Sequence, residues 1–232
     1  MEIQILHMIE GAKQARGVAV IIDVFRAFTV EAWLARNGAA RIIPVGDKEI
    51  AYAFKAANPD AVLVGERNGV MLPGFDFGNS PSQLEHADLT GKTVIHTTSA
   101  GTQGIANASG ADVILTGSLV NARAIAAYIQ QNGFEQVSLV CMGLNAEAQT
   151  EEDNLCAYYI KSLLEGNPLD ISADLEDLKR TSGAKFFDPA QQSVFPERDF
   201  HLSTQVDRFD FVLRLEQSAD GLQEMKQIPV QI

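Results

Sequence analysis

The stretch VAVIIDVFRAFTVEAWLAR, residues 18–36, decides the fold class. It opens with an apolar, largely β-branched run from Val18 to Val24, which is typical of a strand buried on both faces. A helical pattern follows from Thr29 to Arg36, after a short turn that contains Arg26. A buried strand that leads directly into a helix predicts one repeating unit of an α/β sheet.

The same alternation recurs outward from this stretch through the first 165 residues. Further strands are expected at 3–8, 41–45, 61–64, 93–97, 112–115 and 137–142, and further helices at 47–57, 121–131 and 151–164. The pattern predicts an α/β fold with a three-layer mixed sheet and helices on both of its faces.

The sequence after Gly166 is polar and rich in turns, with short helical pieces at 174–180 and 184–191. Residues 209–215 and 225–230 can pair as antiparallel strands across the turn at 218–221, which would add an edge or a small C-terminal appendage to the sheet. We expect one folding unit over residues 1–232, with residues 1–165 as the core and residues 166–232 as an extension packed on it.

Composition restricts the classes of partner. Apolar residues make up 46% of the chain and charged residues 21%, with a formal net charge of −12. Nucleic acids and anionic membranes attract clustered Lys and Arg, so neither is expected as a partner. An acidic protein also repels a phosphorylated substrate, unless a divalent cation or local arginines reverse the field at the site.

The remaining global features predict a cytoplasmic protein. The two cysteines, Cys141 and Cys156, form neither a disulfide framework nor a zinc pattern, and no segment has the roughly 20 apolar residues that span a bilayer. The N-terminal residues do not have the pattern of a secretory signal. The sequence does not fix the oligomeric state, and a homodimer is the commonest state of such enzymes.

Candidate site residues follow the predicted strands, where α/β sheets place their ligands. Asp23 and Arg26 emerge together after the strand at 18–22 and suit a metal and a phosphate, respectively. The alternative is that Asp23 or Thr29 caps the helix and Arg26 lies on the surface. Both interpretations stay open at this stage.

The segment GERNGVMLPGFDFGNSPSQ, residues 65–83, is an unusually long irregular loop after the strand at 61–64. Loops of this kind are commonly functional. Pro81 suits the first turn of a helix whose free N–H groups would face an anion, although a well-capped loop without a ligand is the alternative. Its candidate residues are Glu66, Arg67, Asp76, Asn79 and Ser80.

The segment HTTSAGTQG, residues 96–104, follows the strand at 93–97 and is dense in hydroxyl groups. The side chains of Thr97, Thr98, Ser99 and Thr102 can donate to phosphate or sulfonate oxygens, and Gly101 allows a close backbone approach. His96 lies inside the apolar run, which favours a core histidine over a general acid.

Two further helix starts have simpler interpretations. The segment at 116–124 is explained mostly as a helix N-cap. In the segment 150–153, Thr150 can cap a helix whose first-turn acids complement the helix dipole. Glu152 and Asp153 can instead reach a cation if the preceding loop opens onto the site, because Mg²⁺ takes one or two carboxylates plus waters.

Taken together, the motifs IDVFRA (22–27), GERNG (65–69), GFDFGNSP (74–81), TTSAGT (97–102) and GSLVNA (117–122) resemble the 2-phosphosulfolactate phosphatase (ComB) family in order and spacing. The resemblance covers over half of the chain, from about Asp23 to Asp153. It implies a magnesium-dependent phosphatase that releases phosphate from 2-phospho-3-sulfolactate, on a route to coenzyme M.

Carried over to this chain, the family's motifs contain a set of candidate site residues, and the resemblance does not assign a role to each. Our hypothesis takes Asp23, Arg26 and Arg67 as catalytic residues; Asn79, Ser80, Thr97, Thr98, Gly101 and Thr102 as substrate-binding residues; and Asp23, Glu66, Asp76, Glu152 and Asp153 as ligands of Mg²⁺. We expect Asp23, Glu66 and one of Asp76 or Asp153 to hold the ion, and water to be the attacking group in preference to a carboxylate.

Two departures from the family pattern bear on the substrate. Phe28 stands where a smaller hydroxyl residue is expected, and Ser99-Ala100-Gly101 replaces an Asn-Gly turn. The substrate is therefore open between 2-phosphosulfolactate and another small phosphorylated carboxylate or sulfonate. A non-catalytic anion-binding module is the alternative from another class, although the acids and arginines that catalysis needs are all present.

Overall fold

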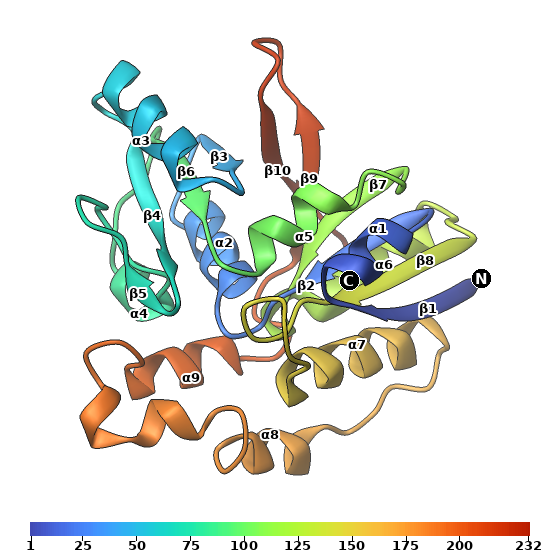
Figure 1. Cartoon of the computed structure of the whole chain (residues 1–232). Coiled ribbons are helices and arrows are strands. Elements are labelled where there is room, and N and C mark those ends of the chain that lie inside the picture. The colour runs from blue at the N-terminus through green and yellow to red at the C-terminus, as the bar shows by residue number, and fades with distance from the viewer.

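The computed structural model describes residues 1–232 and contains one ten-stranded mixed sheet in the order β1-β8-β2-β7-β9-β10-β3-β6-β4-β5 (Figure 1). The strands are β1 (Glu2–His7), β2 (Val18–Ile22), β3 (Arg41–Pro44), β4 (Val62–Arg67), β5 (Val70–Met71), β6 (Thr93–Thr97), β7 (Val113–Gly117), β8 (Gln136–Cys141), β9 (Phe211–Gln217) and β10 (Gln223–Pro229). The predicted strands are therefore present, and the α/β class is confirmed.

Nine α-helices and three short 3₁₀ helices connect the strands. They are α1 (Met8–Gln14), α2 (Ala27–Arg36), α3 (Lys48–Ala57), α4 (Pro81–Leu84), α5 (Gly101–Asn107), η1 (Leu119–Asn121), α6 (Ala122–Gln131), α7 (Glu151–Leu164), α8 (Ser172–Leu178), η2 (Ala184–Phe187), η3 (Pro189–Gln191) and α9 (Glu197–Ser203). None of them is long and apolar enough to cross a membrane.

Strand β2 shows why helices cover both faces of the sheet. All five of its residues are buried, and successive side chains point to opposite faces. Ala19 and Ile21 join one apolar cluster with residues of α1, α2 and α5. Val20 and Ile22 join a second cluster with residues of α6 and α7. Two apolar layers on one strand give the predicted three-layer arrangement.

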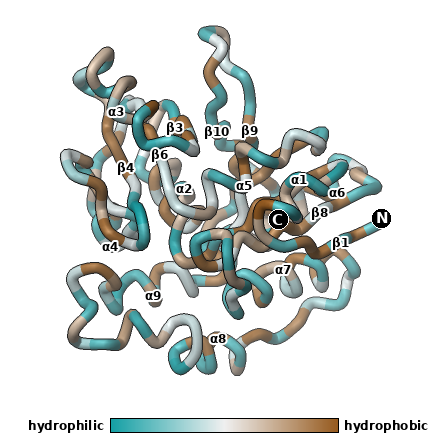
Figure 2. The backbone as a smooth tube through the Cα atoms, viewed as in Figure 1, coloured by the Kyte–Doolittle hydropathy of each residue, from teal (hydrophilic) through white to brown (hydrophobic).

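The β9–β10 hairpin lies in the middle of the sheet, between β7 and β3, so the prediction of an edge or appendage is wrong. The base of β9 is apolar on both faces, with Phe211 and Leu213 in one cluster and Val212 in the other. The other end of the hairpin protrudes and is mostly hydrophilic (Figures 1 and 2). The last strands of the chain thus join two sets of parallel strands.

These two sets are β1, β8, β2 and β7 on one side of the hairpin and β3, β6 and β4 on the other. Antiparallel pairing through β9 and β10 makes the sets run in opposite directions along the sheet. Sheets twist by roughly 20–25° per pair, so six pairings from β2 to β4 accumulate roughly 120–150°. This twist turns the carboxyl ends of both sets toward one region.

Candidate active site

A pocket of about 100 Å³ lies where the carboxyl ends of the two strand sets meet. Its wall combines four carboxylates, two cations, amides, hydroxyls and a few apolar groups. The lining residues are Asp23, Phe25, Arg26, Glu66, Asn68, Gly69, Asn79, Ser99, Ala100, Gly143, Leu144, Asn145, Thr150, Glu152, Asp153, Lys185 and Phe195. Its lining suits a charged ligand.

Asp23 follows β2 directly and is only 6% exposed. Its Oδ1 accepts a hydrogen bond from the backbone N–H of Ala27 at 3.1 Å, which fixes the carboxylate at the start of α2. Burial, with repulsion from Glu66 and Glu152, raises the pKa of Asp23 to about 7. Asp23 is therefore both a helix-start residue and a pocket residue, so its two interpretations are compatible.

Glu152 and Asp153 lie in the first turn of α7 and are 3% and 2% exposed. The two oxygens of Asp153 accept N–H groups of Val24 and Gly143, each at 2.8 Å. Burial raises the pKa of both carboxyl groups, and their mutual repulsion adds to it for Asp153. Thr150 is the N-cap residue and acids fill the first turn, as the simple explanation predicts, but the Thr150 side chain makes no capping hydrogen bond. Glu152 and Asp153 also line the pocket.

Glu66 lines the opposite wall of the pocket, at the end of β4. Its Oε1 accepts the N–H of Ser99 at 2.7 Å, and its Oε2 accepts the N–H of Gly69 at 2.6 Å and the hydroxyl of Ser99 at 3.1 Å. Glu66 thereby ties the loop after β4 to the loop after β6. Its two oxygens are already engaged, which leaves it less available to a metal than Glu152, whose buried Oε2 has no partner.

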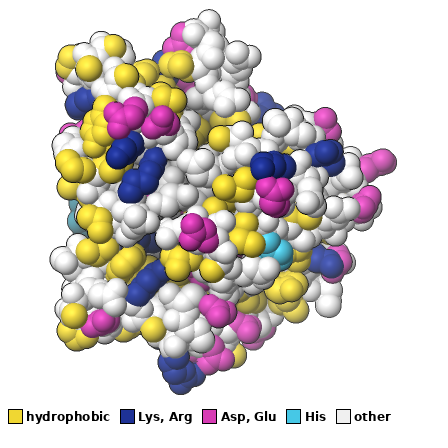
Figure 3. Space-filling view, in the orientation of Figure 1, with side chains coloured by type: hydrophobic (Ala, Val, Ile, Leu, Met, Phe, Trp, Pro, Cys, Tyr) yellow, Lys and Arg dark blue, Asp and Glu magenta, His cyan; other side chains and the backbone are white.

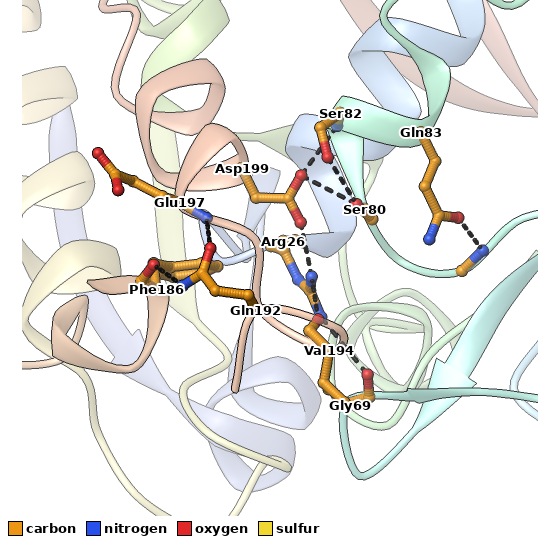
Figure 4. Close-up of polar contacts among 11 residues, drawn as sticks. Arg26, Gly69, Ser80, Ser82, Gln83, Phe186, Gln192, Val194, Glu197 and Asp199 are labelled. Carbon is orange, nitrogen blue, oxygen red and sulfur yellow. Dashed lines mark hydrogen bonds and ion pairs between the residues drawn. The ribbon is translucent and has the colours of Figure 1, made fainter. Parts of the chain in front are cut away.

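Arg26 reaches the pocket from the turn before α2 and is held by a residue far along the chain (Figure 4). Its Nη1 donates to Asp199 Oδ2 at 2.6 Å and to the carbonyl of Val194 at 2.9 Å. Both members of this ion pair are buried, at 3% and 0% exposure. The second guanidinium nitrogen, Nη2, has only a 3.5 Å contact to the carbonyl of Gly69 and remains available to a ligand.

Arg67 does not line the pocket, and its predicted catalytic role does not fit this placement. Its Nη2 donates to the carbonyl of Gly46 and to Thr97 Oγ1, at 3.0 and 2.9 Å. Because neighbouring strand residues point to opposite sides, Glu66 and Arg67 cannot both face the pocket. Thr97 is fully buried in the same contact, so substrate binding by Thr97 does not fit either.

Thr98 and Thr102 lie behind the pocket wall and engage each other. The N–H of Thr98 donates to Thr102 Oγ1 at 3.1 Å, and the N–H of Thr102 donates to Thr98 Oγ1 at 3.2 Å. These hydroxyls organise the start of α5, while Ser99 and Ala100 form the pocket surface. Direct substrate contacts by Thr98 and Thr102 therefore do not fit the arrangement.

Gly101 has a steric role next to Asp23. A Cβ atom at this position would lie 2.8 Å from the Cβ of Ala27 and 3.0 Å from Asp23 Oδ2. Only glycine allows α5 to approach the catalytic candidate this closely. Gly101 therefore helps to position Asp23, and it does not itself line the pocket.

In the loop after β4, Asn79 alone of its three predicted polar residues lines the pocket. Its Oδ1 is buried without a partner. Ser80 points instead to Asp199, with 2.9 Å between Oγ and Oδ1 (Figure 4). Asp76 accepts the N–H of Leu63 at 2.8 Å and lies 3.5 Å from Lys55 Nζ, outside the pocket, so its predicted metal-binding role does not fit.

His96 is fully buried, with its Nδ1 3.0 Å from Glu31 Oε1, and it does not line the pocket. The interpretation of His96 as a core histidine is consistent with this placement.

The face of the molecule in Figure 3 carries Lys and Arg side chains scattered among acidic and apolar groups, without an extended basic patch.

The C-terminal segment supplies pocket residues that the sequence did not single out for a defined role, namely Lys185, Phe195 and, behind Arg26, Asp199. Burial lowers the pKa of Lys185, and Arg26 lowers it further, whereas Glu152 opposes the shift. The segment is therefore part of the pocket wall. No local motif marks these residues, because they come from separate pieces of the segment: Lys185 from η2, Phe195 from the turn before α9, and Asp199 from α9.

The pocket fits a hard divalent cation in its chemistry, although no three acidic, histidine or cysteine side chains converge on one point. Asp23, Glu152 and Asp153 bring three carboxylates into one pocket, where burial raises the pKa of each and repulsion from neighbouring acids adds to the shift for Asp23 and Asp153. Mg²⁺ needs only one or two protein carboxylates, with waters and substrate oxygens as its other ligands. The unpartnered Oε2 of Glu152 is an available donor.

Comparison with known proteins gives first the class and then the family. A family model described as 2-phosphosulpholactate phosphatase matches residues 4–218, which places this α/β protein among the phosphoric monoester hydrolases. Relatives called probable 2-phosphosulfolactate phosphatases include one from Carboxydothermus hydrogenoformans, 36% identical over 74% of this chain and 71% of the relative. The chain belongs to the 2-phosphosulpholactate phosphatase family.

Two other relatives with the same name have a higher and a lower sequence identity to this chain. The protein of Caldicellulosiruptor saccharolyticus is 39% identical over 67% of this chain, and the match spans 66% of that protein, just under two thirds. The protein of Bacillus subtilis is 30% identical over 88% of this chain and 89% of its own length. The family resemblance noted in the motifs is thus confirmed over nearly the full chain.

Proposed function

We propose that the protein is a Mg²⁺-dependent phosphatase that hydrolyses 2-phospho-3-sulfolactate to sulfolactate and phosphate, a step toward coenzyme M. The observation that carries this proposal is the burial of Asp23, Glu152 and Asp153 together in a pocket that also holds Arg26 and Lys185. Acids for a cation and cations for an anion lie in one small space. Membership of the family, with relatives that bear this name, supports the choice of reaction.

The residues that would hold Mg²⁺ are Asp23 and Glu152, with Asp153 as their support. Asp153 is already fixed by two backbone N–H groups, whereas Glu152 has a free buried oxygen. When bound, the ion would neutralise charge on the phosphate and lower the pKa of a bound water. We propose water as the attacking group, in preference to a carboxylate.

The other pocket residues would bind and orient the ester. Arg26 offers Nη2 to an oxyanion, while Asp199 fixes the guanidinium from behind. Glu66 holds the Ser99 and Gly69 loops in register, so that these loops present a rigid wall. Charges and dipoles that are fixed before the ester binds can stabilise its anionic groups without reorganising during the reaction.

A panel of phosphate esters tests the proposal and ranks its substrates. With Mg²⁺ present, we expect kcat/KM for 2-phospho-3-sulfolactate to exceed that for p-nitrophenyl phosphate by at least about 100-fold, since each added charge-assisted contact contributes roughly 1.5–3 kcal/mol. The readout is phosphate release. A higher kcat/KM for a phosphorylated hydroxycarboxylate would assign the alternative substrate class, and turnover of no ester would favour the anion-binding module.

A further inference from the structure

Two cations of the pocket are held against the same two aromatic rings. The Cζ of Arg26 lies 4.8 Å from the ring centre of Phe195 and 5.8 Å from that of Phe186. The Nζ of Lys185 lies 5.2 and 5.6 Å from the same ring centres. The rings themselves pack edge to face, with centroids 5.8 Å apart. Two positive groups are thus fixed near each other on one wall.

The two cations differ in how their charge is balanced. Arg26 is paired with the fully buried carboxylate of Asp199 at 2.6 Å. Lys185, which is partly buried in the pocket wall, has only the two aromatic rings as close partners, and its Nζ takes part in no hydrogen bond or ion pair. A partly desolvated ammonium group beside another cation destabilises the folded protein unless an anion pairs with it.

No pocket carboxylate forms an ion pair with Lys185, although the charge of Glu152 opposes the lowering of the pKa of its ammonium group. Asp153 and Glu66 have both oxygens engaged with backbone N–H groups or Ser99. Asp23 accepts the N–H of Ala27. Lys185 therefore lines the pocket with its hydrogen-bond donors free, and the rings of Phe186 and Phe195 lie next to its ammonium group.

We propose that Lys185, together with Nη2 of Arg26, binds the anionic group of the substrate that is not transferred, its sulfonate or carboxylate. This proposal deepens the proposed function and rests on it for the identity of the ester. The phosphate is bound at the acidic wall, where Asp23 and Glu152 lie, and the second anion is bound at the aromatic wall. Lys185 is then the residue that discriminates doubly anionic esters from simple ones.

Substrate discrimination by the Lys185→Gln variant tests the subsite. We expect kcat/KM to fall about 10- to 100-fold for 2-phospho-3-sulfolactate, the loss of one charge-assisted contact, and less than about threefold for p-nitrophenyl phosphate. Lys185→Arg should recover most of the lost activity. The control is Lys161→Gln, which removes a lysine from the surface of α7, where it lies 3.7 Å from Glu165. Equal losses on both esters would show a structural role and overturn the proposal.

Calorimetric binding of sulfolactate, which lacks the phosphate, gives a readout that needs no turnover. Wild-type protein should bind it in the presence of Mg²⁺, and Lys185→Gln should bind it at least about 10-fold more weakly, with an unfolding midpoint within a few degrees of the wild type. Equal affinity, or no binding by wild type, would overturn the subsite. Lys185-dependent binding without hydrolysis of any ester would retain the subsite and reject the phosphatase function.

Discussion

Replacement of Asp23 by Asn is expected to abolish most activity while it stabilises the metal-free protein. Loss of the carboxylate should lower kcat for phosphate release by roughly 10²–10³, the usual effect of removing one group that stabilises transition-state charge. The amide keeps the oxygen that accepts the N–H of Ala27, so the start of α2 should be preserved. The measurement is phosphate release from 2-phospho-3-sulfolactate at saturating Mg²⁺.

The stabilisation follows from the raised pKa of Asp23, about 7 in the folded protein. Between about pH 4 and 7 the unfolded chain has released this proton and the folded protein has not, so the free energy of unfolding falls as pH rises. Above pH 7 the buried carboxyl group is ionised, and the resulting loss of unfolding free energy is on the order of 4 kcal/mol at most for three pKa units. Asn does not ionise, so the variant does not suffer this loss.

The thermal unfolding midpoints of the metal-free wild type and the Asp23→Asn variant should therefore differ by an amount that depends on pH. At pH 8 the variant should unfold several degrees above the wild type, and near pH 4 the two midpoints should converge. Mg²⁺ should raise the midpoint of the wild type more than that of the variant. A variant that is less stable than the wild type at pH 8, or one that retains full activity, would contradict the assignment of Asp23.

Replacement of Asp199 by Ala is expected to cost the protein about 3–5 kcal/mol of unfolding free energy, because it leaves the Arg26 guanidinium buried without its partner. The same carboxylate also accepts the hydroxyl of Ser80 at 2.9 Å and the N–H of Ser82 at 2.8 Å. Three donors from two separate loops lose their acceptor at once. Urea denaturation measures the loss, and phosphate release should fall as Arg26 loses its orientation.

The chain offers a matched control in the pair of Arg180 and Asp177, whose Nη2–Oδ1 distance is also 2.6 Å but whose side chains are 78% and 67% exposed. Asp177→Ala should cost less than about 1 kcal/mol, as exposed pairs do. Similar losses for the two variants would show that burial does not decide the value of the Arg26–Asp199 pair, and would remove the basis for the role given to Asp199.

Local patterns predicted the elements well and their arrangement less well. The buried strand at 18–22 and the helix after it are visible in their hydrophobicity, and the strand end correctly located Asp23. The central place of the β9–β10 hairpin depends on single or double pairings with β3 and β7, more than 90 residues away in sequence. Hydrophobic alternation shows that a hairpin forms, but it carries no information about which strands flank it.

The site shows the same limit. Glu66 and Arg67 both follow a strand end, but the alternation of a strand directs only Glu66 into the pocket. In the hydroxyl-rich segment after β6, Thr98 and Thr102 hydrogen-bond to each other at the start of α5 and do not face the pocket. Lys185 and Asp199 lie in a polar segment without a motif, and only the folded chain brings them to Arg26.

The most direct test of the account is phosphate release from 2-phospho-3-sulfolactate by the wild-type protein, measured side by side with Mg²⁺ and with a chelator that removes it. We expect release that requires the ion and returns when Mg²⁺ is added back, because the carboxylates of Asp23 and Glu152 are buried in the same pocket and neither forms an ion pair with a basic side chain. Absence of release with Mg²⁺, or release that is unchanged by the chelator, would contradict it.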